Sequence, residues 1–142
     1  MSRNKIKLKQ ESFSAANGIS RNKIAFSLEY LTKNKSYTFA FFDGRIRDEL
    51  QARQSLSELL KNLSAKTWVG IAQIGKRTQC GFETLPAVQL NFSPDGYEFS
   101  RDEKVWVFRF GSQQYRLIGI QDSNVLYVLG YDFDHSAYNH GK

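Results

Sequence analysis

The sequence predicts an α+β fold: an antiparallel sheet with a C-terminal three-stranded meander, and two helices packed on one face. Two observations carry this prediction. The last third of the chain holds three runs rich in β-branched and aromatic residues, which short polar turns separate. A leucine-rich stretch with helical spacing precedes them. Because such short connections cannot join parallel strands, the three runs form an antiparallel meander.

The composition is that of a globular protein suited to polyanionic partners. Of 142 residues, 41% are hydrophobic and 24% are charged, which allows one domain with a sizeable core. The formal net charge of +6 favours a nucleic acid or an acidic protein as partner. No apolar run has the length of a membrane span, so we expect a cytoplasmic protein with no membrane partner. The single cysteine, Cys80, excludes an internal disulfide and a cysteine-based zinc site.

The N-terminal part divides into a basic segment and the start of the domain. Residues 1–23 are expected to form either a solvated basic arm or an edge strand that lysines protect. A single α+β domain is expected over residues 24–142. It begins with a predicted hairpin, because residues 24–30 alternate apolar and polar side chains and 37–42 are rich in aromatic residues.

Two helices are predicted in the middle of the chain. The first spans Arg45 to Leu63, and its apolar residues recur near helical spacing, which indicates a core-facing stripe. The stripe consists of Ile46, Leu50, Leu56, Leu59, Leu60 and Leu63. Residues 64–75 are expected to form a shorter helix, with Thr67 as its N-cap.

The terminal meander carries two arginines inside strands that are otherwise apolar. Strand alternation puts Arg109 on the face of Val105 and Val107, and Arg116 on the face of Ile118. The two arginines are therefore expected near each other across the hairpin. Burial of an unpaired guanidinium is costly, so each is expected to meet a carboxylate, face solvent or hold a phosphate. The candidate carboxylates are Asp102, Glu103, Asp122 and Asp132.

The residues after the last strand are dense in groups that transfer protons. His135 is the best general acid or base, since its ordinary pKa lies near neutrality. Asp132 or Asp134 would orient it, and Tyr138 would donate or position a proton. In the alternative interpretation, Asp134 caps a final turn while His135 and Tyr138 pack against the sheet edge. A metal site made of Asp132, Asp134, His135 and His140 matches no spacing with a known mechanism, so no metal or cofactor is predicted.

Several stretches of the sequence resemble those of a known protein family. The helical pair, the runs Trp106–Phe110, Tyr115–Ile118 and Asn124–Leu129, and the ending Tyr131–Tyr138 resemble the RelE/ParE superfamily of bacterial toxin–antitoxin modules. The resemblance implies a ribosome-associated mRNA endonuclease, a gyrase poison or a non-toxic relative. Its partners would be RNA or the ribosome and a cognate antitoxin, which is typically an acidic protein.

The resemblance also implies roles for particular residues. Arg109 and Arg116 would stabilise the scissile phosphate, while His135 and Tyr138 would assist proton transfer. No metal would be needed, because the 2′-hydroxyl of RNA supplies the nucleophile. The expected nucleic-acid contacts are Lys76, Arg77, Arg101 and Lys104, with Tyr115 stacking on a base.

Two features depart from this family pattern. The chain has an N-terminal extension before Ile24, and its ending carries Asp132 and Asp134. The two carboxylates would repel a phosphate unless they orient His135 or pair with an arginine. Two further interpretations therefore stay open. One is a non-catalytic module that binds nucleic acid or protein through the same basic face. The other is an interaction subunit whose N-terminal arm makes the contact.

Overall fold

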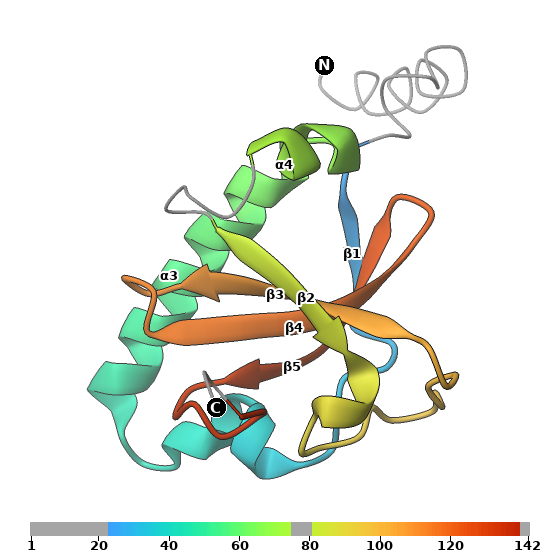
Figure 1. The fold of residues 1–142 in the computed structure, drawn as a ribbon. Coiled ribbons are helices and arrows are strands. Elements are labelled where there is room, and N and C mark those ends of the chain that lie inside the picture. The colour runs from blue at the N-terminus through green and yellow to red at the C-terminus, as the bar shows by residue number, and fades with distance from the viewer. Residues whose placement is uncertain (1–22, 75–80, 140–142) are drawn as a thin grey trace, which may run out of the picture.

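The structure, a computed structural model, describes residues 23–74 and 81–139. Its centre is a five-stranded sheet of order β1-β5-β4-β3-β2 (Figure 1). The strands are β1 (Ala25–Ser27), β2 (Phe82–Pro86), β3 (Lys104–Phe110), β4 (Tyr115–Asp122) and β5 (Val125–Asp132). Two α-helices, α3 (Ile46–Ser64) and α4 (Trp68–Ile74), accompany the 3-10 helices η1 (Lys35–Tyr37), η2 (Phe39–Phe42) and η3 (Ala87–Gln89). The predicted α+β class is confirmed.

The terminal meander is confirmed as well. The strands β3, β4 and β5 pair antiparallel in chain order, and β2 adds to the free edge of β3. One irregularity lies between Ile118 and Gly119, where the register of β4 against β5 shifts. A side chain at Gly119 would put its Cβ 2.7 Å from the carbonyl oxygen of Tyr127, so only glycine fits there.

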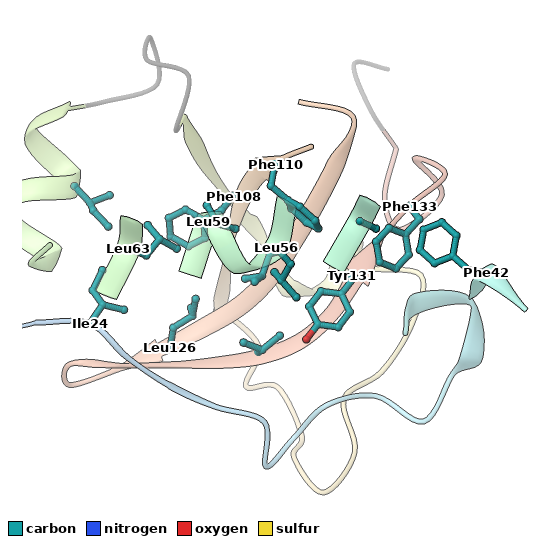
Figure 2. Packing of buried hydrophobic residues seen from close by; sticks show 14 residues of the cluster. Ile24, Phe42, Leu56, Leu59, Leu63, Phe108, Phe110, Leu126, Tyr131 and Phe133 are labelled. Atoms are coloured by element: carbon teal, nitrogen blue, oxygen red, sulfur yellow. The ribbon is translucent and has the colours of Figure 1, made fainter. Parts of the chain in front are cut away.

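Both helices pack on one face of the sheet, which we call the helix face. Leu56, Leu59 and Leu63 of α3 are buried against Phe108, Phe110 and Leu126 (Figure 2). In α4, the ring of Trp68 lies 4.9 Å from that of Trp106. The predicted N-cap is confirmed, since the Gly70 N–H donates to Thr67 Oγ1 at 3.0 Å.

The predicted leucine stripe of α3 needs a correction at its N-terminal end. Ile46 and Leu50 are exposed, at 78% and 56%, whereas Ala52 is completely buried. At about 100° per residue, Ile46 and Leu50 lie more than about 100° around the helix from the direction that Ala52, Leu56 and Leu59 share. The core-facing stripe of α3 therefore begins at Ala52.

The predicted N-terminal hairpin is wrong. Of residues 24–30, only Ala25–Ser27 form a strand, and it pairs parallel with β5. Residues 37–42 turn into 3-10 helices, because Asn34 and Thr38 cap them: Asn34 Oδ1 accepts the Ser36 N–H and Thr38 Oγ1 accepts the Ala40 N–H. A strand would send Phe41 and Phe42 to opposite faces, yet both rings pack on Phe133. Of the predicted arm 1–23, only Lys23 lies within the described residues, and it forms a single bridge with Thr67.

The opposite face of the sheet is covered by loops, the chain end and the short 3-10 helices η1 and η3. We call it the loop face. Val105, Val107, Ile118 and Leu129 are buried there under Tyr37, Phe92, Ala137 and Tyr138. The covering segments approach the sheet closely at Gly130, where a Cβ would lie 2.9 Å from the Phe92 ring and 3.2 Å from the Tyr37 carbonyl oxygen. The loop face therefore holds a second apolar cluster, into which any charged strand residue must fit.

Candidate functional site

The two strand arginines meet on the loop face, as the sequence predicts. Arg109 and Arg116 are direct partners in the antiparallel register of β3 and β4. Directly opposed residues have Cβ atoms about 5 Å apart, so two like charges stand side by side. Both side chains are half-buried. This arrangement requires counter-charges nearby.

Two carboxylates flank the arginine pair on the neighbouring strands. Asp132 is the register partner of Arg116 on β5 and is completely buried. Glu83 on β2 is the partner of Val107, which puts it on the loop face beside Arg109. Together with Tyr138 these residues form what we call the charged cluster: Glu83, Arg109, Arg116, Asp132 and Tyr138. Asp132 was among the carboxylates expected near an arginine, but Glu83 was not foreseen.

Tyr138 ties the chain end to this cluster. Its buried hydroxyl donates to Glu83 Oε2 at 2.9 Å. Burial, and then the hydrogen bond to Glu83, raise the pKa of Tyr138 to about 12, while Arg116 acts in the opposite direction. Tyr138 is therefore a neutral phenol at physiological pH. It can donate a hydrogen bond but is not a base.

Arg116 and His135 are both anchored on the turn between β3 and β4. Arg116 Nη1 donates to the carbonyl oxygen of Gln113 at 2.7 Å and to that of Tyr115 at 3.3 Å. His135 is exposed, and its Nε2 lies 2.9 Å from the Gln114 carbonyl oxygen. Because a carbonyl only accepts, this nitrogen carries the proton in the neutral ring. His135 has a backbone φ of +64°, a conformation that costs energy in a residue other than glycine.

The carboxylates after β5 organise the chain end. Asp132 accepts the Ser136 N–H at 3.0 Å with Oδ1 and the Ala137 N–H at 3.3 Å with Oδ2. Asp134 accepts the Ser136 N–H at 3.2 Å and the Ser136 hydroxyl at 2.6 Å. The alternative interpretation therefore holds for Asp134, which caps the turn, and for Tyr138, which is buried, but not for His135, which is exposed. Capping by both carboxylates fixes the position of Tyr138.

Among the other predicted nucleic-acid contacts, those that the structure describes do not join this cluster. Tyr115 lies on the helix face, with its ring 5.2 Å from Phe133 and 5.5 Å from Phe110, because strand alternation sends it to the side opposite Arg116. Base stacking beside Arg116 is therefore not supported. Lys104 and Arg101 are exposed near the start of β3. Five residues of strand separate Lys104 from Arg109, which is about 16 Å. Lys76 and Arg77 lie outside the described residues.

A cavity of about 460 Å³ lies between α3 and the end of β3. Its walls include Glu58 and Asn62 of α3, Arg109, and the turn from Gly111 to Gln113. The residues that α3 contributes put this cavity on the helix-face side of β3, whereas strand alternation directs the Arg109 side chain to the loop face. Its lining combines polar residues with the apolar side chains of Leu59 and Phe110.

Within residues 23–74 and 81–139, no group of three or more His, Cys, Asp or Glu side chains is placed to hold a metal ion. No helix in the same ranges is long and apolar enough to cross a membrane. Comparison with protein-family models, curated proteins and solved structures finds no match to this chain. Function must therefore be inferred from the charged cluster itself.

Proposed function

We propose that this chain is a RelE-like protein that cleaves RNA by metal-independent acid–base chemistry on the loop face. One observation carries the proposal: the cross-strand pair of Arg109 and Arg116 lies on the same sheet face as the contact between Tyr138 and Glu83. Cations that stabilise the phosphate charge and a carboxylate that accepts a proton are groups that a phosphodiester cleavage can use, and the Tyr138 phenol holds that carboxylate. The net charge of +6 suits RNA or the ribosome as target and an acidic antitoxin as partner.

The reaction needs a base, an acid and charge stabilisation. The 2′-hydroxyl of RNA attacks the adjacent phosphorus, the bond from phosphorus to O5′ breaks, and a 2′,3′-cyclic phosphate forms. Glu83 is the carboxylate placed to take the proton of the 2′-hydroxyl. Arg109 and the second terminal nitrogen of Arg116 stabilise the charge that grows on the phosphate.

The remaining groups have separate roles in this proposal. His135 in its imidazolium form gives a proton to the leaving O5′ through Nδ1, because its Nε2 stays bonded to the Gln114 carbonyl. Tyr138 holds Glu83 through a hydrogen bond and remains protonated throughout. Asp132 offsets the charge of the arginine pair, which accounts for a carboxylate so near a phosphate site.

A cleavage assay with single-stranded RNA, run with and without ribosomes, tests the proposal. We expect products that end in a 2′,3′-cyclic phosphate, and about 100-fold slower cleavage for Arg109→Ala, the typical loss for one charge-stabilising donor. Arg47→Ala removes the same charge from an exposed position on α3 and should stay within about twofold. A His135→Ala/Tyr138→Phe protein that cleaves RNA, or arrests cells, as strongly as the parent would show the proposal to be wrong.

The second candidate is a non-catalytic module that binds nucleic acid or protein through the same face. It is favoured by the burial of Tyr138 and Asp132 and by the internal hydrogen bonds that occupy them. In this case RNA affinity falls on replacement of Arg109 or Arg116, while no product forms at any excess of protein. Filter binding and product analysis on the same samples separate the two candidates.

A further inference from the structure

A second cavity, of about 270 Å³, lies on the loop face and has a different chemistry. We call it the tyrosine pocket. It is lined by Tyr30, Tyr97, Glu103, Ile120, Gln121, Asp122 and Tyr127. Ile120 lies four residues from Arg116 along β4, which is about 13 Å. The pocket is therefore separate from the charged cluster and rests on different residues.

Three tyrosines from distant parts of the chain form one wall of this pocket. The ring of Tyr30 lies 5.1 Å from that of Tyr97 and 5.2 Å from that of Tyr127, between centroids. Tyr30 is fixed by its backbone, whose carbonyl oxygen accepts the Asp95 N–H at 3.1 Å. The Tyr97 hydroxyl donates to Glu103 Oε2 at 2.6 Å. The wall is thus held in place before any ligand arrives.

The pocket is acidic although the chain as a whole is basic. Two of its lining residues, Glu103 and Asp122, carry carboxylates, and none carries a positive charge. The negative charge around the pocket also raises the pKa of the Tyr30 and Tyr97 hydroxyl groups. Glu103 raises the pKa of Tyr97 to about 12, and Glu29 is the main cause that raises the pKa of Tyr30. A field that disfavours a phenolate favours a cation.

We propose that the tyrosine pocket binds the guanidinium group of an arginine side chain that a partner polypeptide presents. Carboxylate and phenol oxygens match the five N–H donors of a guanidinium, and tyrosine rings match its flat, weakly hydrated faces. An ammonium group is more strongly hydrated and gains less from the rings. The pocket is smaller than the roughly 300 to 1,000 Å³ of sites for drug-sized ligands, so it suits one side chain.

Calorimetric titration of the full chain tests this proposal with defined probes. Nα-acetyl-arginine amide should bind saturably, and Nα-acetyl-citrulline amide, a neutral group of nearly equal shape, at least tenfold more weakly. The lysine analogue should lie between them. A Gly-Arg-Gly peptide with blocked ends should bind at least as tightly as the arginine amide. Binding of the amide but not of the peptide would overturn the assignment to a polypeptide.

Matched variants locate the binding. Asp122→Asn should weaken the arginine probe at least fivefold, and because Asp122 is exposed the variant should keep the parent's melting temperature. Glu103→Gln provides a second removal of charge. Glu58→Gln makes the same change on α3, away from the pocket, and should leave the affinity unchanged. Equal binding of arginine and citrulline, or equal losses in all three variants, would overturn the proposal. RNA cleavage plays no part in these measurements.

Discussion

The two faces of the sheet are both buried, but by different means. On the helix face, regular elements with periodic apolar residues make the core, and Figure 2 shows Leu56, Leu59 and Leu63 meeting Phe108 across it. On the loop face, loops and short 3-10 helices cover the strands, and charged side chains lie among apolar ones. The helix face depends on shape and area. The loop face depends on hydrogen bonds to buried polar groups such as Asp132 and Tyr138.

This difference teaches where a functional site can be placed in so small a domain. Arginine and aspartate on the helix face would displace apolar packing that holds α3 and α4. On the loop face, Asp132 is satisfied by backbone N–H groups that the chain end brings to it. The loop face can therefore hold a charged cluster while the helix face supplies most of the stability.

The largest effect is expected from a cavity on the helix face. Phe108 is completely buried in the apolar cluster of the helix face, to which both α3 and α4 contribute side chains. Phe108→Ala should therefore lower the free energy of unfolding by about 3 to 5 kcal/mol. Val88→Ala, at an exposed position, should change it by less than about 0.5 kcal/mol. Urea unfolding measures both. A loss below about 1 kcal/mol for Phe108→Ala would mean that the helix face is not the main source of stability.

The next effect is expected from the buried carboxylate of the loop face. Asp132→Ala leaves the N–H groups of Ser136 and Ala137 without their acceptor and removes a buried negative charge from the register position opposite Arg116, so it should cost about 2 to 4 kcal/mol. Asp134→Ala removes hydrogen bonds to the same Ser136 from an exposed position and should cost about 1 kcal/mol or less. Equal losses in the two variants would contradict the distinction between buried and exposed capping.

The contrast between faces also separates what the sequence could predict from what it could not. Strand alternation is a geometric rule, so the common face of Arg109 and Arg116 followed from their positions alone. Glu83 escaped prediction because its place depends on the pairing of β2 with β3, which are distant in sequence. Its visible signal was an acidic residue on the strand face of Leu85, opposite to the face of Phe82.

The N-terminal error has a similar cause. Residues 37–42 satisfy a strand pattern by composition, but the chain uses Asn34 and Thr38 as caps for 3-10 turns. Both capping residues are local signals from which the 3-10 turns could have been predicted. The parallel pairing of β1 with β5 could not be predicted in this way, because it joins segments about a hundred residues apart and no local rule selects that partner.

A smaller effect concerns the phenol of the charged cluster and its response to pH. The folded-state pKa of Tyr138 is about 12, above the ordinary 10.0, so the folded chain keeps a proton that the unfolded chain releases. Stability is therefore complete below pH 10 and declines as the pH rises from 10 to 12. Tyr138→Phe should cost about 1 kcal/mol at neutral pH and make this decline shallower.

Tyr97 provides the comparison for that experiment. The hydrogen bond to Glu103 also raises the pKa of Tyr97 to about 12. Tyr97→Phe should therefore make the loss of stability between pH 10 and 12 shallower, and the double variant should make it shallower still. Denaturant unfolding at several alkaline pH values gives the slopes. A Tyr138→Phe protein that loses stability as steeply as the parent would show that the phenol is not held by Glu83.

The smallest effect, and one of opposite sign, is expected at the turn that anchors Arg116 and His135. Gln113 has a φ of +67°, which is unfavourable for any residue with a Cβ, so Gln113→Gly should stabilise the protein by about 0.5 to 1 kcal/mol. Gln114→Gly, in the same turn but without a positive φ, should destabilise it by a similar amount. Thermal unfolding distinguishes the signs.

The Gln113→Gly variant also tests whether the strained turn is needed for RNA cleavage. Both Arg116 and His135 bond to backbone carbonyls of the turn, and neither bond uses the Gln113 side chain. If the turn is strained because it must hold these groups at a fixed distance, Gln113→Gly should gain stability and lose RNA-cleaving activity together. Gained stability with unchanged activity would mean that the strain serves only the hairpin, and that the loop face tolerates it without functional need.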